Sequence, residues 1–167
     1  MTPNRTRGVA SIVRARVWTL ATACLLAALL PCTAVQATAA QQVQASRAWI
    51  RVLPGVLPAG AYVTLRNDGG QAAQLTGAKS SSYAQVMLHQ SSMSGGMSRM
   101  RGVESLAIPA HGQVVLAPAG YHLMLMHAVA PVVLGTRVRL TLEFSDGSTL
   151  PVDFLARPAN ALGPDSP

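Results

Sequence analysis

Apolar and polar residues alternate along most of the chain after Val43, with a period of two rather than the 3.6 of an amphipathic helix. Clusters of Gly, Pro, Asn and Asp separate the alternating runs, and such clusters mark turns. The pattern predicts an all-β domain, built as a two-sheet Greek-key sandwich of about eight or nine short strands. The strand candidates are residues 48–53, 61–66, 72–78, 86–89, 97–103, 113–116, 121–127, 137–144 and 150–155.

Two connections stand out between these runs. Asp146-Gly147 lies between the last two strand candidates, and this dipeptide favours a tight hairpin. Residues 90–96 contain Ser, Met and Gly with little else, which is too polar for a core strand. We therefore expect a flexible loop between His89 and Met97.

The first 40 residues are typical of a secretory signal peptide, and small residues at 37, 39 and 40 offer cleavage sites. The apolar run 17–30 is shorter than the roughly 20 residues of a membrane-spanning helix. Lipid attachment at Cys32 is the third interpretation, but Leu30 and Pro31 lack the small side chain that such processing prefers. The sequence thus predicts a signal peptide at 1–40, a β-sandwich domain at 41–157 and a flexible tail at 158–167.

Both cysteines, Cys24 and Cys32, lie in this predicted signal peptide. The mature chain would therefore have no disulfide, thiolate ligand or cysteine nucleophile. Four of the thirteen basic residues precede residue 41 and all six acidic residues follow it, which leaves a mature excess of three positive charges. So small an excess, without interleaved aromatic residues, is weak support for nucleic-acid binding.

Methionine and histidine are concentrated between residues 87 and 127, which hold all four histidines and every methionine after the first. His122 and Met124 share one face of a predicted strand, about 6 to 7 Å apart along the backbone, so both can reach one ion. His89 could supply a third ligand, and a methionine between Met93 and Met100 a fourth. Thioether and imidazole ligands favour Cu(I), whereas zinc normally takes thiolates or carboxylates.

Packing and solvent exposure explain the other members of this group more simply. Met87 and Met126 are expected to fill the core, as strand methionines usually do. His111, in a turn, and His127, on the face opposite His122, are expected at the surface. We predict no enzyme, because the sequence contains neither a Gly-x-Ser-x-Gly motif nor a Gly-rich phosphate loop, and its acidic residues lie mostly in turns.

The spacing of four of these residues resembles the signature of the PCu(A)C family of periplasmic copper chaperones. In this chain ten residues separate His89 from Met100, and 21 residues separate Met100 from His122-Leu123-Met124. The segments 48–51 and 120–126 are similar to family sequence as well, and the resemblance covers residues 48–155.

The resemblance implies a cupredoxin-like sandwich that holds one Cu(I) near its surface through His89, Met100, His122 and Met124. It also implies delivery of that copper, in the periplasm, to the CuA site of cytochrome c oxidase or to a Sco-type thiol protein. Met93 and Met97 could assist capture or transfer. Residues 159–167 contain neither His nor Met, so no second, Cu(II)-binding extension is expected.

Three other functions remain open at this point, and we expect a monomer for each. A copper-sequestering or resistance protein would need the same ligands. An electron-transfer cupredoxin would need a cysteine thiolate, which the mature chain lacks. A purely structural or adhesive sandwich would not bind copper.

Overall fold

The computed structural model describes residues 36–166, so the predicted signal peptide and both cysteines lie outside the described residues. This part of the chain holds one short helix and ten strands, which confirms the all-β prediction. The strand count exceeds the expected eight or nine because 106–108 is too short for its pattern to predict a strand. The elements are α2 (Ala39–Gln42), β1 (Val43–Arg51), β2 (Ala59–Asn67), β3 (Ala73–Lys79), β4 (Tyr83–Ser94), β5 (Met97–Gly102), β6 (Leu106–Ile108), β7 (Gln113–Leu116), β8 (Tyr121–Ala128), β9 (Arg137–Phe144) and β10 (Thr149–Arg157).

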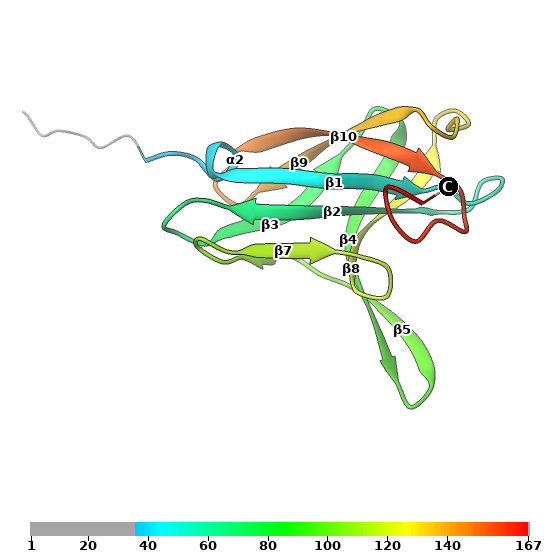
Figure 1. The fold of residues 1–167 in the computed structure, drawn as a ribbon, viewed down its shortest axis with the longest axis horizontal. Helices are drawn as coiled ribbons and strands as arrows, with labels where there is room; N and C mark the ends of the chain where they lie inside the picture. Colours follow the sequence, from blue (N-terminus) through cyan, green and yellow to red (C-terminus); the bar gives the residue numbers. More distant parts are fainter. Residues whose placement is uncertain (1–35, 167) are drawn as a thin grey trace, which may run out of the picture. The chain divides into compact units, whose positions relative to one another are not determined.

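All ten strands join in one hydrogen-bonded sheet that folds over a common core (Figure 1). Its order is β5-β4-β8-β2-β1-β10-β9-β3-β6, and β7 also pairs with β2. One edge of β2 pairs with β1, and the other edge is shared, because its first residues pair with β8 and its later residues with β7. Strands distant in sequence, such as β4 and β8, therefore lie side by side.

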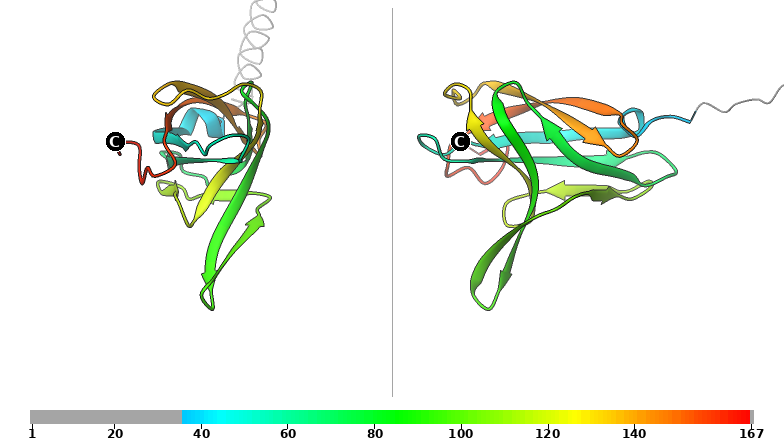
Figure 2. Two further views of the ribbon diagram at one scale, coloured as in Figure 1. Left: turned by 90° about the vertical axis from the view of Figure 1, so that its right-hand side faces the viewer. Right: turned by 180° about the vertical axis from the view of Figure 1, so that it is seen from behind.

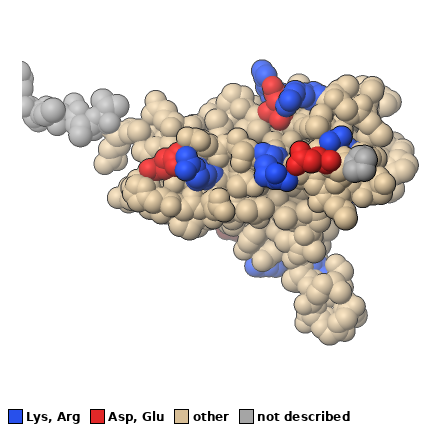
Figure 3. Space-filling model, viewed as in Figure 1, with Lys and Arg blue, Asp and Glu red and all other residues tan. Residues whose placement is uncertain are grey.

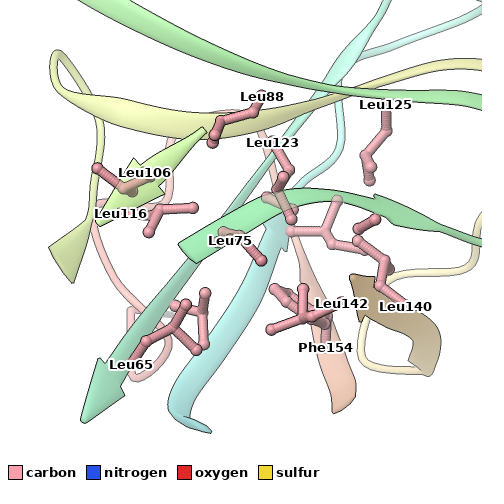
Figure 4. Packing of buried hydrophobic residues seen from close by; sticks show 14 of the residues in the cluster. Leu65, Leu75, Leu88, Leu106, Leu116, Leu123, Leu125, Leu140, Leu142 and Phe154 are labelled. Atoms are coloured by element: carbon pink, nitrogen blue, oxygen red, sulfur yellow. The ribbon is translucent and has the colours of Figure 1, made fainter. Parts of the chain in front are cut away.

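The core follows directly from the alternation in the sequence. Every second residue of β9 from Val138 to Phe144 is buried, and the residues between them are more exposed. The Asp146-Gly147 hairpin joins β9 to β10 as predicted, with Gly147 at a φ of 79°. Leucines from seven strands, β2, β3, β4, β6, β7, β8 and β9, share this core with Phe154, and Figure 4 shows how they pack. The fully buried leucines from these strands include Leu65, Leu75, Leu123, Leu125, Leu140 and Leu142.

A second, smaller cluster lies beside the main core, where Trp49 and Tyr62 pack on Ala161. The rings of Trp49 and Tyr62 are 4.6 Å apart, and the guanidinium of Arg51 lies over both. Arg51 also donates hydrogen bonds from Nε and Nη2 to the Ala161 carbonyl, at 3.1 and 2.8 Å. Residues 158–166, which the sequence predicts as a flexible tail, thus fold back onto β1 and β2.

The end of β4 and all of β5 form a two-stranded hairpin, here called the arm (residues 90–102), which projects from the body of the domain (Figures 1 and 2). Gly95 and Gly96 form its turn with φ values of 58° and 77°, the positive-φ pair that a two-residue hairpin turn requires. Every residue of β5 is exposed. The expectation of an irregular loop over residues 90–96 is therefore wrong. These residues extend β4 through backbone pairing, without burying an apolar face.

Candidate metal centre

Neighbouring strands β4 and β8 bring histidine and methionine together. His89 lies directly opposite His122 in the antiparallel register, and Met87 lies directly opposite Met124. Because side chains alternate along a strand, these four residues emerge on one face of the strand pair. The intervening leucines on the other face, Leu88 and Leu123, are buried in the core. The core thus fixes which face the histidines take.

His122 is held in one orientation. The residue is buried, at 6% exposure, and its Nδ1 lies 3.1 Å from the Gly120 carbonyl oxygen. A carbonyl can only accept, so Nδ1 carries the proton and donates to it. This leaves Nε2 as the lone-pair nitrogen, and a hydrogen bond from the other ring nitrogen is what orients most metal-binding histidines.

The His89 ring lies edge-on to the His122 ring, with the centroids 5.9 Å apart. The residue is partly exposed, yet both of its ring nitrogens are covered from solvent and neither has a hydrogen-bond partner among the described residues. Burial, together with the nearby His122, lowers the pKa of His89 below 6.5. A neutral imidazole with buried, unpaired nitrogens is costly in a protein, and binding a metal ion through one of them would offset part of that cost.

The arm places Met100 near these histidines. Met100 pairs with Ser91, and the register puts its side chain on the same face as His89. Met93 shares this face, whereas Met97 lies on the opposite one. Met100 is 52% exposed, so its sulfur is accessible from solvent.

A hollow of about 300 Å³ lies between the arm and the body of the domain. Met93, Met100 and His122 line it, with three serines of the arm. Arg51 and Tyr62 line it as well, and the Tyr62 ring is centred 6.4 Å from the His122 ring. One side of the hollow therefore carries soft thioether and imidazole donors, and another carries a fixed positive charge.

The structure brings His89, His122 and Met124 together on one face and puts Met100 in a hollow with His122. The interpretation of Met87 as core filling is wrong, because Met87 is 36% exposed on the same face as the histidines. The pattern did hold the signal for this, since Met87 and His89 are two apart on one strand. The core prediction for Met126 is also wrong, because Met126 is only half-buried and lies on the His122 face, outside the core cluster. His111 and His127 are exposed, as expected.

Carboxylate and thiolate ligands are not gathered around this face. Within residues 36–166 no three residues of the His, Cys, Asp and Glu types are grouped closely enough to hold a metal ion. A site on this face must therefore combine two imidazoles with thioethers. Such a donor set is neutral and soft, which matches Cu(I) better than zinc, calcium or magnesium.

An all-β domain with a histidine and methionine face agrees with what the comparisons with known proteins find. Residues 43–156 match the family model "Putative lipoprotein LpqE-like". The chain belongs to this family, which is of the PCu(A)C type. Among the described residues, no helix has the length and apolar character needed to cross a membrane.

Individual relatives agree with this assignment. "Putative lipoprotein Lxx21020" of Leifsonia xyli subsp. xyli is 39% identical over 114 residues, which are 68% of each chain. The solution structure of CuI-DR1885 from Deinococcus radiodurans is 34% identical with a TM-score of 0.57, covering 75% of this chain and 83% of that one. The copper-bound PCuAC domain of PmoF2 shares the fold at 21% identity and a TM-score of 0.60, covering 74% of this chain and 99% of that one.

Proposed function

We propose that this protein is an exported copper chaperone that binds Cu(I) through His89, Met100, His122 and Met124. The observation that carries the proposal is the histidine pair: His89 has two buried nitrogens without partners, and His122 presents Nε2 because its Nδ1 is held by Gly120. The copper-bound state of two relatives, CuI-DR1885 and the PmoF2 domain, supports copper as the cargo.

A neutral donor set suits release as well as capture. Thioethers bind Cu(I) more weakly than thiolates, so a partner with cysteine thiolates can take the ion by ligand exchange. We infer that the recipient is a Sco-type thiol protein or the CuA-bearing subunit of cytochrome c oxidase. Because residues 36–166 contain no cysteine, an electron-transfer site of the blue-copper kind lacks its thiolate in this domain.

Competition titration with a coloured Cu(I) chelator tests the binding site. The parent protein, His122→Ala and Met100→Leu are compared with His111→Ala as a matched control, because His111 is exposed and lies outside the site. We expect His122→Ala and Met100→Leu to lose Cu(I) affinity by at least the roughly 10- to 100-fold that is typical when a hydrogen-bond partner of a metal ligand is removed. Parental affinity in both would show that the ligand assignment is wrong.

Delivery needs a separate experiment, since a copper-sequestering protein would bind equally well. Oxidase activity is measured in a strain deleted for the gene, with added copper and with either the parent or His122→Ala. Recovery with the parent alone supports delivery. Equal activity in the deletion strain and its parent strain would favour sequestration.

Export to the periplasm is supported by the lipoprotein names of the family and of the Leifsonia protein. Mass spectrometry of the mature protein locates its first residue. A start at 38, 40 or 41 fits the predicted signal peptide, and a lipid-modified start at Cys32 would replace it with an anchored form.

A further inference from the structure

Met87 occupies a place in the site that the four-ligand assignment leaves without a role. It lies opposite Met124, two residues from His89, so the two histidines form one rung of the β4–β8 ladder and the two methionines form the next rung. Adjacent strands separate paired Cβ atoms by about 5 Å, and two residues along a strand span about 7 Å. An ion above the centre of that rectangle lies roughly 4 Å from each corner in projection, within reach of imidazole and thioether side chains.

Packing does not account for Met87. The side chain is 36% exposed, whereas its neighbour Leu88 is 4% exposed and belongs to the core. Within the part of the chain that the structure describes, the Met87 sulfur has one polar contact, accepting a hydrogen bond from Gln85 Nε2 at 3.2 Å. Sulfur is a weak acceptor, so a metal could replace that contact at little cost.

Met87 and Met100 differ in the support behind them. Met100 lies on β5, in which every residue is exposed, whereas Met87 lies on the part of β4 that pairs with β8 over the core. Opening the arm would carry Met100 away from the histidines and leave Met87 in place. Segments that bury little apolar surface open at low free-energy cost.

We propose that Met87 is a further Cu(I) ligand, which takes the place of Met100 beside His89, His122 and Met124 when the arm opens. This inference rests on the proposed function. It gives the site two ligand sets that share three members, one closed by the arm and one built on the body alone. Copper then stays bound while the arm exposes the site to a partner.

The test combines Cu(I) competition titration with X-ray absorption at the copper edge, on the mature protein. The variants are Met87→Leu, Met100→Leu and the double variant, with Met126→Leu as the matched control. Met126 lies on the same face one rung further on, opposite Gln85. We expect Met100→Leu to keep a second sulfur ligand, and the double variant to lose that ligand and to lose more affinity than the product of the two single losses.

Two results would overturn the inference: a double variant that matches Met100→Leu in affinity and sulfur ligands, or a Met126→Leu variant that itself loses a sulfur ligand. Leucine at exposed position 87 should leave folding intact, which the thermal unfolding of each apo-variant checks. The proposed function fails separately, when the parent binds no Cu(I) or His122→Ala binds as tightly as the parent. Loss of binding in His122→Ala, together with a double variant that matches Met100→Leu, refutes the Met87 inference alone.

Discussion

Replacing His89 by leucine should abolish copper binding and at the same time make the copper-free protein more stable. In the apo-protein both ring nitrogens of His89 are covered from solvent and have no partner among the described residues. Leucine removes those nitrogens and keeps an apolar side chain beside the buried His122 ring. His89 thus destabilises the apo-protein, as is expected of a residue kept for metal binding in the proposed site.

The size of the effect follows from the burial of the two nitrogens. A buried polar group without a partner costs about 1–3 kcal/mol. Because the His89 residue is only partly buried, the lower part of that range applies, and we expect the free energy of unfolding to rise by about 1–2 kcal/mol. For a domain of this size the melting temperature should rise by about 3–8 °C.

His122→Leu is the matched comparison, because it makes the same change one strand away with the opposite sign. His122 donates from Nδ1 to the Gly120 carbonyl, which also accepts a hydrogen bond from the Ser91 N–H. Leucine removes one of these two hydrogen bonds and should lower stability by about 1 kcal/mol. Urea unfolding of the apo-proteins measures both variants. A His89→Leu protein less stable than the parent would refute the reasoning, since the nitrogens would then be satisfied in solution.

Three further predictions concern pH, the arm and the C-terminal segment. Burial and the nearby His122 lower the pKa of His89 in the folded protein, so the unfolded chain binds more protons than the folded one. The free energy of unfolding of the apo-parent should therefore fall as the pH drops from 6.5 through the lower folded pKa. His89→Leu should flatten that decline when urea unfolding is measured as a function of pH. Gly96→Ala places a side chain at a φ of 77°, which destabilises the arm by about 1–2 kcal/mol. Hydrogen exchange should become faster in residues 90–102, with little change in the global melting temperature. Gly96→Asn should accelerate exchange less. Arg51→Met removes two hydrogen bonds to Ala161 and the stacking on Trp49 and Tyr62. We expect the free energy of unfolding to fall by about 1–2 kcal/mol and proteolysis after residue 158 to become faster. Unchanged proteolysis would contradict the inference that Arg51 holds the C-terminal segment on the domain.

The sequence predicted the parts of the fold in which alternation and burial coincide. The turn preference of Asp146-Gly147 predicted the last hairpin. Period-two alternation predicted the inward face of 137–144 and the shared face of His122 and Met124, because the residues that fill the core determine the opposite face. Pairing of His89 with His122 does not follow from any local pattern. It depends on β4 and β8 becoming neighbours, which only the complete topology decides.

The arm and Met87 show why other parts could not be predicted. Residues 90–94 extend β4 without burying any apolar face, so hydrophobic alternation does not predict this part of the strand. The Gly95-Gly96 pair was the only local pattern that favoured a hairpin there. Met87 was expected in the core because methionine usually fills strand interiors. Its exposure depends on which face of β4 packs on the core. Leu88, opposite Leu123, takes the core face, so Met87 takes the other, and this is again a property of the β4–β8 pairing.

The two parts of the site therefore differ in a way that bears on copper transfer. The histidines and Met124 stand on strands whose other face is core, so moving them would disrupt the packing of Leu88 and Leu123. Met100 stands on the arm, which has no core beneath it and whose tip, residues 93–97, carries no charged side chain (Figure 3). A partner that binds the arm can displace Met100 without disturbing the rest of the ligands. In the site that we propose, three ligands thus stand over the core and Met100 stands on the arm, and we expect a partner to reach the copper on the side where the arm opens.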